Sequence, residues 1–503
     1  MTSYRGYFKD KKITVHGLGL LGRGIGDVIF LAKEGADLIV TDLKVKDDLA
    51  DSLVRIKKEL GETLYKKIKF VLGEHRLGDF KNRDFILKAA GVPLDSPFIA
   101  EARKNNIPIK MDASWFAELA PEGVIIVGVT GTRGKSTTTH LIHEILEAAQ
   151  GLSFGNLSRK VLGQEKAALG KIFLGGNVRG LATLPLLKKV KAGDIVVMEL
   201  DSWQLQGFGD SKISPNISVF TNLMVDHQNY YGSAAKAMGG DPMDMYFADK
   251  ANIFLNQKEG DELVCSKEVL GLIRKKYPVK LAKLVTGQVR NFAGQAIVPD
   301  AGVVPKSWKV KLLGEHNRLN IAYAVTVARI LDIPEKIIKT AVENYVGVPG
   351  RLEFVREVKG VKYYNDTTAT TPDGVIAALK ALGGSQGRSF GGRSRTVLGN
   401  IVLIGGGRDK ELDYKKYAPV VKKSVKSLAL FAGTGSDKII KALGKTKFPV
   451  KVFDNMPEAF AWSNSFAKKG DIVLLSPGAA SFGVFKNEFD RGDQFVAQVK
   501  KLK

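Results

Sequence analysis

The segment that most limits the possible folds of this chain lies between residues 123 and 148. The apolar run GVIIVGVT is followed by the loop GTRGKSTT and then by an amphipathic stretch. A strand, a glycine turn and a helix in this order predict a phosphate-binding loop, because backbone N–H groups and the helix dipole meet an anion at the helix N-terminus. Lys135 would bring a point charge to the β- and γ-phosphates of a nucleotide, and the Ser136 hydroxyl is placed for Mg²⁺.

The loop departs from a strict Walker sequence at one position. Val129 stands where that sequence has glycine, whereas the shorter pattern T-G-T-x-G-K-S fits. A glycine-rich turn with a chance GKS is the alternative, and the strand before the loop and the helix after it argue against that alternative. The sequence therefore predicts ATP binding through Gly131, Thr132, Gly134, Lys135, Ser136 and Thr137.

Apolar, β-branched runs alternate with helical segments along the whole chain. Such alternation predicts an α/β protein built of βαβ units with mostly parallel sheets. Breaks near Pro121 and at 346–351 divide the 503 residues into three domains, 1–121, 122–346 and 347–503. The segment 386–395, rich in Gly, Ser and Arg, is expected to be a surface loop, and 151–171 a second insertion. The expected strands lie at 12–19, 36–42, 123–131, 194–202, 217–223, 400–407, 427–433 and 471–478.

A second glycine pattern opens the first domain. The strand ITVHG runs into Gly17-Leu18-Gly19 and Gly22, and Asp42 closes the next strand. This order resembles the dinucleotide fingerprint, in which the backbone approaches a phosphate and an acidic side chain takes a sugar hydroxyl. A nucleotide or nucleotide-sugar site is favoured over an ordinary tight turn. Taken alone, the fingerprint would also suit an NAD-dependent oxidoreductase, but Lys135 argues against that class.

The composition narrows the class of protein further. Lys and Arg number 76 against 52 Asp and Glu, a net charge of +24, which favours anionic partners. The basic residues are spread along the chain and form no recognisable nucleic-acid-binding motif, so no nucleic acid partner is expected. No run approaches the roughly eighteen apolar residues of a membrane span. Cys265 is the sole cysteine, which excludes an internal disulfide and indicates the cytoplasm.

Two further expected strands end in groups that suit a cation. Glu199 follows DIVVM, and Asp226-His227 follows ISVFTNLMV. Hard oxygen ligands are preferred by Mg²⁺, so Glu199 and His227 could reach a metal beside the γ-phosphate, directly or through water. Each is by itself more often a capping or packing residue. Lys250 is a solvated helix residue by default, and no spacing singles it out.

At this point the sequence resembles the Mur ligases. The resemblance covers nearly the whole chain, with its motifs in family order. It implies an N-terminal Rossmann-like domain that holds a UDP-sugar, a central P-loop ATPase domain, and a C-terminal Rossmann-like domain that closes over the nucleotide and binds the amino acid. The matching segments are GLGLLGRG, GVTGTRGKST, MELDSWQLQ, TNLMVDHQNYYGS, GEHNRLNIAYAV, GRLEFV, YYNDTTATTP, GGGRDK and SPGAASFGVFKNEFDRGDQF.

The resemblance also implies a reaction and its cofactors. A substrate carboxylate would attack the γ-phosphate of ATP to give an acyl phosphate and ADP, and an amine would then displace phosphate. Two Mg²⁺ ions are expected, and the substrates would be UDP-N-acetylmuramoyl-L-alanine and D-glutamate, in peptidoglycan precursor synthesis by a monomer.

The same resemblance assigns roles to individual residues. Catalytic roles fall on Lys135, Glu199, His227, Lys250 and Arg351. Metal contacts fall on Ser136, Glu199, His227 and a carbamylated Lys250, which would present a carboxylate-like group to the second ion. Nucleotide contacts fall on Asn317, Asn320, Arg351 and Asp366 in addition to the loop. Asn177 lies near the metal and γ-phosphate and is grouped with the UDP-substrate residues Gly17, Leu18, Gly19, Gly22 and Asp42, while Lys410 and Ser481 would receive the amino acid's carboxylates.

Three departures from the family pattern bear on the substrates. Thr368 stands where a lysine is common, Glu488 stands where an aromatic side chain is usual, and Ala89-Ala90-Gly91 replaces a serine-proline-glycine turn. They leave the ATP chemistry intact and keep open a Mur-type ligase for another amino acid or a folylpolyglutamate-type ligase.

Overall fold

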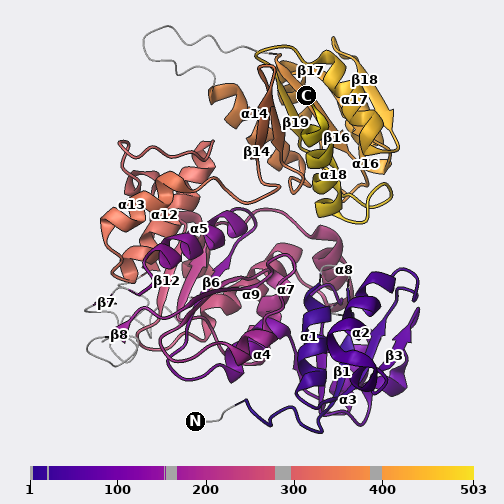
Figure 1. Ribbon diagram of the computed structural model, residues 1–503, viewed down its shortest axis with the longest axis vertical. Coiled ribbons are helices and arrows are strands. Elements are labelled where there is room, and N and C mark those ends of the chain that lie inside the picture. The colour runs from indigo at the N-terminus through magenta and orange to yellow at the C-terminus, as the bar shows by residue number, and fades with distance from the viewer. Residues whose placement is uncertain are drawn as a thin grey trace. The chain divides into compact units, whose positions relative to one another are not determined.

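The computed structural model describes residues 4–19, 22–93, 95–151, 153–154, 167–277, 296–385 and 399–503. The expected loop at 386–395 lies outside these residues, and the expected insertion at 151–171 lies only partly within them. The chain forms two compact units, one of Met1–Trp308 with Leu319–Val342 and the other of Lys309–Arg318 with Glu343–Lys503. Three sheets of five or six strands account for the architecture (Figure 1).

The first sheet is wholly parallel, with the order β3-β2-β1-β4-β5. Apolar side chains of α1 and α2 pack on one face, and those of η1 and α3 pack on the other. Because the chain leaves β1 toward β2 and later returns to β4 on the opposite side, the sheet is doubly wound. Its elements are β1 (Lys12–His16), α1 (Arg23–Lys33), β2 (Asp37–Asp42), α2 (Ala50–Tyr65), β3 (Lys69–Leu72), η1 (Leu77–Phe80), β4 (Phe85–Lys88), α3 (Pro97–Lys104), β5 (Ile109–Lys110) and α4 (Asp112–Leu119).

The second sheet, also parallel, has the order β13-β12-β11-β6-β10-β9 and belongs to the same compact unit. Every residue of β6, β10, β11 and β12 is buried, which is why these strands read as unbroken apolar runs. Its elements are β6 (Ile125–Thr130), α5 (Lys135–Ala148), β9 (Ile172–Gly176), η2 (Leu184–Lys188), β10 (Ile195–Glu199), α7 (Ser202–Asp210), β11 (Ile217–Phe220), α8 (Gln228–Met238), α9 (Pro242–Leu255), β12 (Glu262–Cys265), α10 (Lys267–Lys276), β13 (Ala296–Ile297) and η3 (Ala301–Val303).

Two short strands and two helices complete this part of the chain. Strands β7 (Ser153–Phe154) and β8 (Ala167–Ala168) pair antiparallel. Helices α12 (Glu315–Ile330) and α13 (Glu335–Asn344) follow η3, and each contains residues of both compact units.

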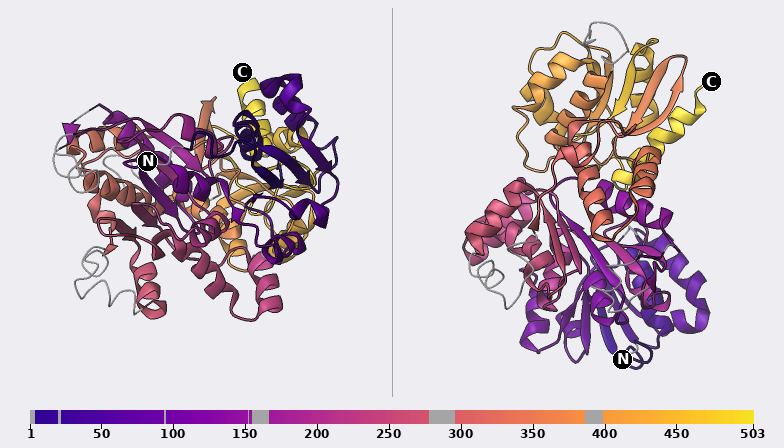
Figure 2. Two further views of the ribbon diagram at one scale, coloured as in Figure 1. Left: turned by 90° about the horizontal axis from the view of Figure 1, so that it is seen from below. Right: turned by 90° about the vertical axis from the view of Figure 1, so that its left-hand side faces the viewer.

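The third sheet has the order β14-β15-β19-β16-β17-β18 and is parallel except for the pair β14–β15. Helices α14, α15 and α16 pack on one face and α17 and α18 on the other (Figures 1 and 2). Its elements are β14 (Glu353–Val358), β15 (Val361–Asn365), α14 (Pro372–Ser385), β16 (Ile401–Gly406), α15 (Tyr417–Ser424), β17 (Val425–Phe431), α16 (Thr434–Leu443), β18 (Val450–Phe453), α17 (Met456–Phe466), β19 (Ile472–Leu475) and α18 (Glu488–Lys501).

The predicted fold class is confirmed, since three mostly parallel α/β sheets follow one another along the chain. The sheets fall within 1–121, 122–346 and 347–503, and the boundaries themselves stay a prediction. Each predicted strand is present, whereas the short strands β3, β4, β5 and β18 carried too weak an apolar signal to be expected. None of the helices in the described part of the chain has the length and apolar character that a membrane span requires.

Candidate functional site

The phosphate-binding loop has the predicted form of a buried strand, a turn and a helix. Strand β6 ends at Thr130, and α5 begins at Lys135 with Gly134 as its N-cap residue, at φ 84°. This left-handed conformation favours glycine. A Cβ at Gly134 would also lie 2.2 Å from Oδ1 of Asn320, one of the residues expected at the nucleotide. No side chain caps α5, so its N-terminus keeps the electrostatic character that attracts an anion.

The loop is held in place by the two residues that follow strand β11. Thr132 donates its backbone N–H to the carbonyl of Asn222 at 2.9 Å, and Arg133 donates its N–H to Oδ1 of the same residue at 2.9 Å. The Thr221 hydroxyl donates to the Arg133 carbonyl at 2.6 Å. These bonds fix the first half of the loop, while Lys135 and Ser136 open the helix beside it.

Ser136 and Glu199 meet at the end of the loop. The buried Ser136 hydroxyl donates to Oε2 of Glu199, which closes the neighbouring strand β10. Nδ2 of Asn177 lies 3.5 Å from Oε1 of the same carboxylate, and the Asn177 N–H donates to the Glu199 carbonyl at 2.6 Å. The structure therefore places Asn177 with the predicted metal and phosphate residues. It does not line the cavity that lies at the carboxyl ends of β1 and β4 in the first sheet.

Two lysines converge on the carbonyl of Gly131. Lys135 Nζ donates to it at 3.0 Å and to the Thr132 carbonyl at 3.3 Å, while Lys250 Nζ lies 3.0 Å from the same carbonyl and 3.2 Å from the Thr130 hydroxyl. Lys250 is 1% exposed, and burial together with Lys135 holds its pKa well below the usual value. The default expectation of a solvated helix residue is thus wrong for Lys250. Burial thus favours the uncharged amine, which is the nucleophilic form that carbamylation requires.

His227 and Asp226 lie on the other side of the loop. His227 is the N-cap residue of α8, at φ 55°, and its ring stacks edge-on against Trp203 with 4.8 Å between centroids. Arg133 donates to Oδ2 of Asp226 at 2.8 Å. Burial alone would raise the pKa of Asp226, but His227 and Arg133 outweigh it and lower the pKa to about 2. The carboxylate therefore stays charged and anchors Arg133.

These groups match the preferences of Mg²⁺ in part. The Ser136 hydroxyl and the Glu199 carboxylate are hard oxygen donors already in contact, and Mg²⁺ commonly takes one or two protein oxygens with phosphate and water completing its shell. Within the described ranges no cluster of three or more His, Cys, Asp and Glu side chains is assembled for a metal. The donor set at Ser136 and Glu199 thus fits a cation that arrives with the nucleotide.

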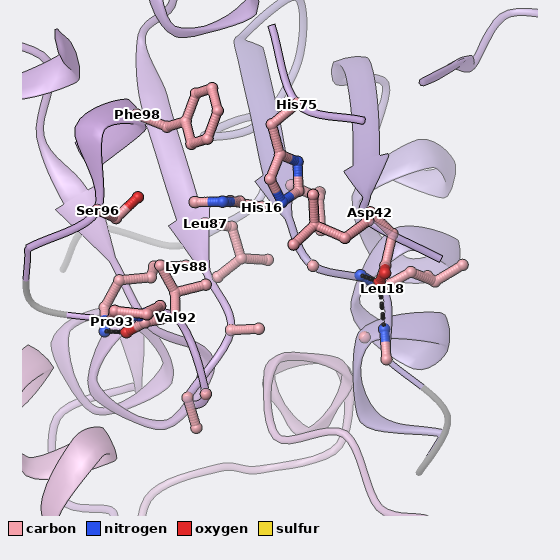
Figure 3. A pocket seen from close by; sticks show the side chains of 18 of the residues that line it. His16, Leu18, Asp42, His75, Leu87, Lys88, Val92, Pro93, Ser96 and Phe98 are labelled. Carbon is pink, nitrogen blue, oxygen red and sulfur yellow. Dashed lines mark hydrogen bonds between the residues drawn. The ribbon is translucent and has the colours of Figure 1, made fainter. Parts of the chain in front are cut away.

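A cavity of about 660 Å³ opens at the first sheet (Figure 3). It lies beyond the carboxyl ends of β1 and β4, which are adjacent in the sheet although the chain continues from them in opposite directions. Ligands of doubly wound sheets bind at such a switch point. The predicted residues Gly17, Leu18, Gly19 and Asp42 line the cavity, as does the turn Ala89-Ala90-Gly91.

The sequence predicts that Asp42 contacts a sugar hydroxyl, whereas in the structure its carboxylate accepts backbone N–H groups. Its Oδ2 accepts the backbone N–H groups of Leu18 at 2.9 Å and Gly19 at 3.1 Å, and its Oδ1 accepts that of Lys44 at 2.9 Å. The carboxylate therefore holds the glycine loop in place and occupies donors that such a loop can offer to a phosphate.

Lys88, which the sequence reasoning did not identify, also lines this cavity. It is the last residue of β4 and is 7% exposed. Its neighbour His16, the last residue of β1, is buried, and burial together with His75 and Lys88 lowers the pKa of His16 to about 3. A lysine at the end of an apolar strand carries no sequence signal that separates it from a solvated one.

In the second compact unit, the residues expected at the amino acid lie on two paired loops. Arg408 and Ala480 exchange backbone hydrogen bonds of 3.0 Å, which joins the loop after β16 to the loop after β19. Lys410 Nζ, on the first loop, donates to the Thr370 hydroxyl at 3.0 Å, and Ser481, on the second, is buried. Thr370 thereby joins the predicted pair, and nothing in the sequence pattern distinguished it from its threonine neighbours.

Asp366 secures the chain near Arg351. Its Oδ1 accepts the Leu352 N–H at 3.0 Å, and its Oδ2 accepts the Ser476 hydroxyl at 2.8 Å. Burial raises the pKa of Asp366 to about 7, an effect that Ser476 and the Leu352 N–H only partly oppose. Thr368, which stands in place of a lysine, donates its hydroxyl to the Gly350 carbonyl at 2.9 Å.

The other predicted residues of this unit are also placed. Asn317 is buried and donates to the Leu313 carbonyl at 2.8 Å. Glu488 opens α18, and its carbonyl accepts the Thr367 hydroxyl at 2.6 Å. Asn317, Arg351, Asp366, Lys410 and Ser481 thus belong to the second unit, whereas Lys135, Ser136, Asn177, Glu199, His227, Lys250 and Asn320 belong to the first.

Fold and site together define a three-sheet α/β protein with a P-loop at its central sheet and a separate cavity at its first. Residues 129–328 match the Mur ligase middle domain, and residues 350–478 match the Mur ligase glutamate ligase domain. The UDP-N-acetylmuramoylalanine–D-glutamate ligase of Roseiflexus sp. (strain RS-1) is 33% identical, with 96% of this chain and 97% of the relative covered. The enzyme of the same name from Borreliella burgdorferi (strain ZS7) is 31% identical, with 98% of each chain covered.

A solved structure supports the fold. The UDP-N-acetylmuramate-alanine ligase MurC of Thermotoga maritima superposes with a TM-score of 0.55 at 18% identity, over 97% of this chain and 99% of that one. This chain belongs to the Mur ligase family.

Proposed function

We propose that this protein joins D-glutamate to UDP-N-acetylmuramoyl-L-alanine with the hydrolysis of ATP to ADP and phosphate. Full-length similarity to two ligases that carry this activity in their names supports the choice of substrates. The observation that carries the chemistry is the contact of Ser136 with Glu199 at the start of α5, beside the buried Lys250. It joins a phosphate-binding loop to a carboxylate, as phosphoryl transfer requires.

The reaction has two steps. The terminal carboxylate of the acceptor attacks the γ-phosphorus, the bond to the β-phosphate oxygen breaks, and an acyl phosphate and ADP result. The glutamate amine then attacks the acyl carbon, loses a proton, and expels inorganic phosphate. Lys135 would neutralise charge on the transferred group, and the N-terminus of α5 would support the leaving phosphates.

We propose that the reaction also requires Mg²⁺. Mg²⁺ bound with the nucleotide would neutralise the phosphate oxygens during transfer. Ser136 and Glu199 are the residues we propose to hold it. His227 and a carbamylated Lys250 are proposed for a second ion, since burial lowers the pKa of Lys250 and favours its nucleophilic form. A Glu199→Gln substitution is expected to raise the Mg²⁺ concentration for half-maximal phosphate release about 10- to 100-fold.

The remaining assignments are proposed from the resemblance of these residues to the motifs of the Mur ligases. The cavity at the first sheet would receive the UDP moiety, since Gly17, Leu18, Gly19 and Asp42 border it. Asn320, Asn317, Arg351 and Asp366 would contact ATP, and Lys410 and Ser481 the carboxylates of the amino acid. We also propose that the enzyme acts in the cytoplasm as a monomer, in agreement with its single, buried cysteine.

The decisive experiment measures phosphate release with ATP, Mg²⁺, UDP-N-acetylmuramoyl-L-alanine and one amino acid at a time. D-Glutamate, L-glutamate, D-aspartate and meso-diaminopimelate are compared, because Thr368 and Glu488 bear on that choice. We expect D-glutamate alone to stimulate turnover and the product mass to rise by one glutamyl residue. Stimulation by a different amino acid would redirect the assignment within the family, and no stimulation by any of them would refute it.

A further inference from the structure

Lys88 stands at the switch point of the first sheet. It is the last residue of β4 and pairs in register with His16, the last residue of β1. The cavity lies beyond these two strand ends. Figure 3 shows Lys88 and Val92 on one side of the cavity, and Asp42 with Leu18 on the other. A second cavity, of about 310 Å³, is also lined by Lys88, so its side chain borders both spaces.

The Lys88 amine is buried with neutral partners only. It donates to Oε1 of Gln206 at 3.2 Å and, more weakly, to the Val92 carbonyl at 3.5 Å. Among the residues that the structure describes, no carboxylate forms an ion pair with it. A buried cation gains most when an anion supplies a charge-assisted hydrogen bond, because the surrounding dielectric is low.

The charges around Lys88 set its protonation. Burial lowers the pKa of Lys88 to about 8; Asp201, Asp210 and Asp249 oppose that shift and Arg103 adds to it. His16, at the adjacent strand end, is neutral near pH 7 because its pKa is about 3. The amine is therefore mostly charged at neutral pH and loses its proton above pH 8.

The opposite side of the cavity is less suited to an anion, although Arg23, the first residue of α1, also lines the cavity. The Asp42 carboxylate already accepts the N–H groups of Leu18 and Gly19, so a second negative group would be repelled there. The turn Ala89-Ala90-Gly91 has no hydroxyl to offer. Lys44 lines the cavity but is exposed, where solvent screens its charge.

We propose that Lys88 is the residue that pairs with the diphosphate of the UDP-linked substrate. The uridine then lies toward Leu18 and Asp42, and the diphosphate crosses to the β4 side of the cavity. This inference rests on the proposed function, since it takes the UDP-linked acceptor as the ligand. It makes Lys88 a binding residue for the substrate and not only a bridge from the first sheet to Gln206 of α7.

The test compares the affinities of the full-length protein for uridine and for UDP, measured by calorimetry near pH 7. The ratio of the two dissociation constants reports the contribution of the diphosphate alone. In Lys88→Met we expect this ratio to fall about 10-fold or more, the value of one charge-assisted hydrogen bond, with uridine binding unchanged. A ratio equal to that of the wild type would overturn the proposal.

Two matched variants separate binding from structural support. Gln206→Leu removes the bridge to α7 but keeps the cation, and Lys44→Met removes an exposed cation from the same cavity. Both are expected to keep the wild-type ratio. A loss in Lys44→Met with no loss in Lys88→Met would assign the diphosphate to Lys44 instead.

The wild-type protein provides a measurement that does not depend on the folding of a variant. Between pH 7 and pH 9.5 the affinity for UDP should fall as Lys88 loses its proton, while the affinity for uridine stays constant up to the ionisation of the base. A constant affinity for UDP over this range would contradict the proposal. If the wild type does not prefer UDP to uridine at any pH, the proposed substrate class fails and not merely the role of Lys88.

Discussion

The two glycine loops of the first compact unit share a backbone plan and differ in charge. Each follows a buried parallel strand, and each ends in a glycine of left-handed conformation that starts a helix without a side-chain cap, Gly22 at φ 88° and Gly134 at φ 84°. The central loop carries its own cation, Lys135, over its carbonyl groups. The N-terminal loop instead holds the Asp42 carboxylate on its N–H groups.

This difference shows that the backbone motif alone does not select the ligand. A loop with an internal lysine presents positive charge at a helix N-terminus, which suits the phosphates of ATP. A loop already neutralised by an internal carboxylate no longer offers those donors to a phosphate. The cations that line the N-terminal cavity come from outside the loop, and among Arg23, Lys44 and Lys88 we propose Lys88 for an anionic ligand.

The largest effect is expected from Lys135. Replacing it by methionine removes the cation of the central loop but leaves the N-terminal cavity unchanged. Phosphate release should fall about 10²- to 10³-fold, while UDP affinity stays at the wild-type value. Steady-state kinetics and calorimetry with UDP measure the two quantities. Equal loss of both would show that the two loops do not act independently.

Alanine substitutions at Gly22 and Gly134 distinguish the cost of a left-handed alanine from the cost of a steric clash of its Cβ. At Gly134 a Cβ would lie 2.2 Å from Oδ1 of Asn320, whereas at Gly22 its nearest neighbours would be 3.6 Å away. Both variants carry the cost of a left-handed alanine, about 1–2 kcal/mol. Gly134→Ala must in addition displace Asn320 and should weaken ATP binding, while Gly22→Ala should lower the urea midpoint without weakening ATP binding. Comparable ATP affinity in the two variants would contradict this.

Asp226 gives the central loop an acid-sensitive anchor. The pKa of Asp226 is lowered to about 2 from its usual 3.8, so the stability it contributes is fully present above about pH 4 and is lost as pH falls through 2. This contribution is about 2 kcal/mol. The variant Asp226→Asn should be less stable than the wild type at pH 7, and the difference should shrink toward pH 2. Urea titrations over this range measure it, and a difference that does not change with pH would exclude the interactions with His227 and Arg133 as its source.

The smallest effect is expected at Asp42. The Asp42→Asn amide has one oxygen left to accept the hydrogen bonds that two carboxylate oxygens now share among Leu18, Gly19 and Lys44. The loss should be about 1 kcal/mol, with faster hydrogen exchange at the Leu18 and Gly19 amides. Exchange that matches the wild type would mean that the loop keeps its conformation without this carboxylate.

Much of the central loop could be predicted from its sequence because all of its parts are local. The strand, Gly134, Lys135 and Ser136 lie within a dozen residues, and their spacing fixes their geometry. To predict the contact of Ser136 with Glu199, the order of the strands in the sheet was needed as well. Glu199 ends β10, and Ser136 lies in the helix that follows the loop after the neighbouring parallel strand β6, so adjacency of the two strands in the sheet was sufficient to bring them together.

Only some of the residues that line the N-terminal cavity could be predicted from the sequence. Gly17, Gly19 and Asp42 follow a known pattern, but the pattern does not say whether the carboxylate faces a ligand or the loop itself. Lys88 has no local signature, since its burial depends on Gln206, 118 positions away, and on the cavity formed by two loops. The default interpretation of Lys250 as a solvated helix residue was wrong for the same reason, because its burial depends on Thr130 and Gly131, far from it in sequence.

By itself the sequence determined the three α/β sheets, the phosphate-binding loop and the family, because periodic apolar runs and short motifs are properties of neighbouring residues. Only the tertiary structure decided the burial of Lys250, the partners of Asp42 and the place of Lys88. Burial and hydrogen bonding depend on groups brought together from distant segments, and these decide whether a charged side chain is solvated, paired or available to a ligand.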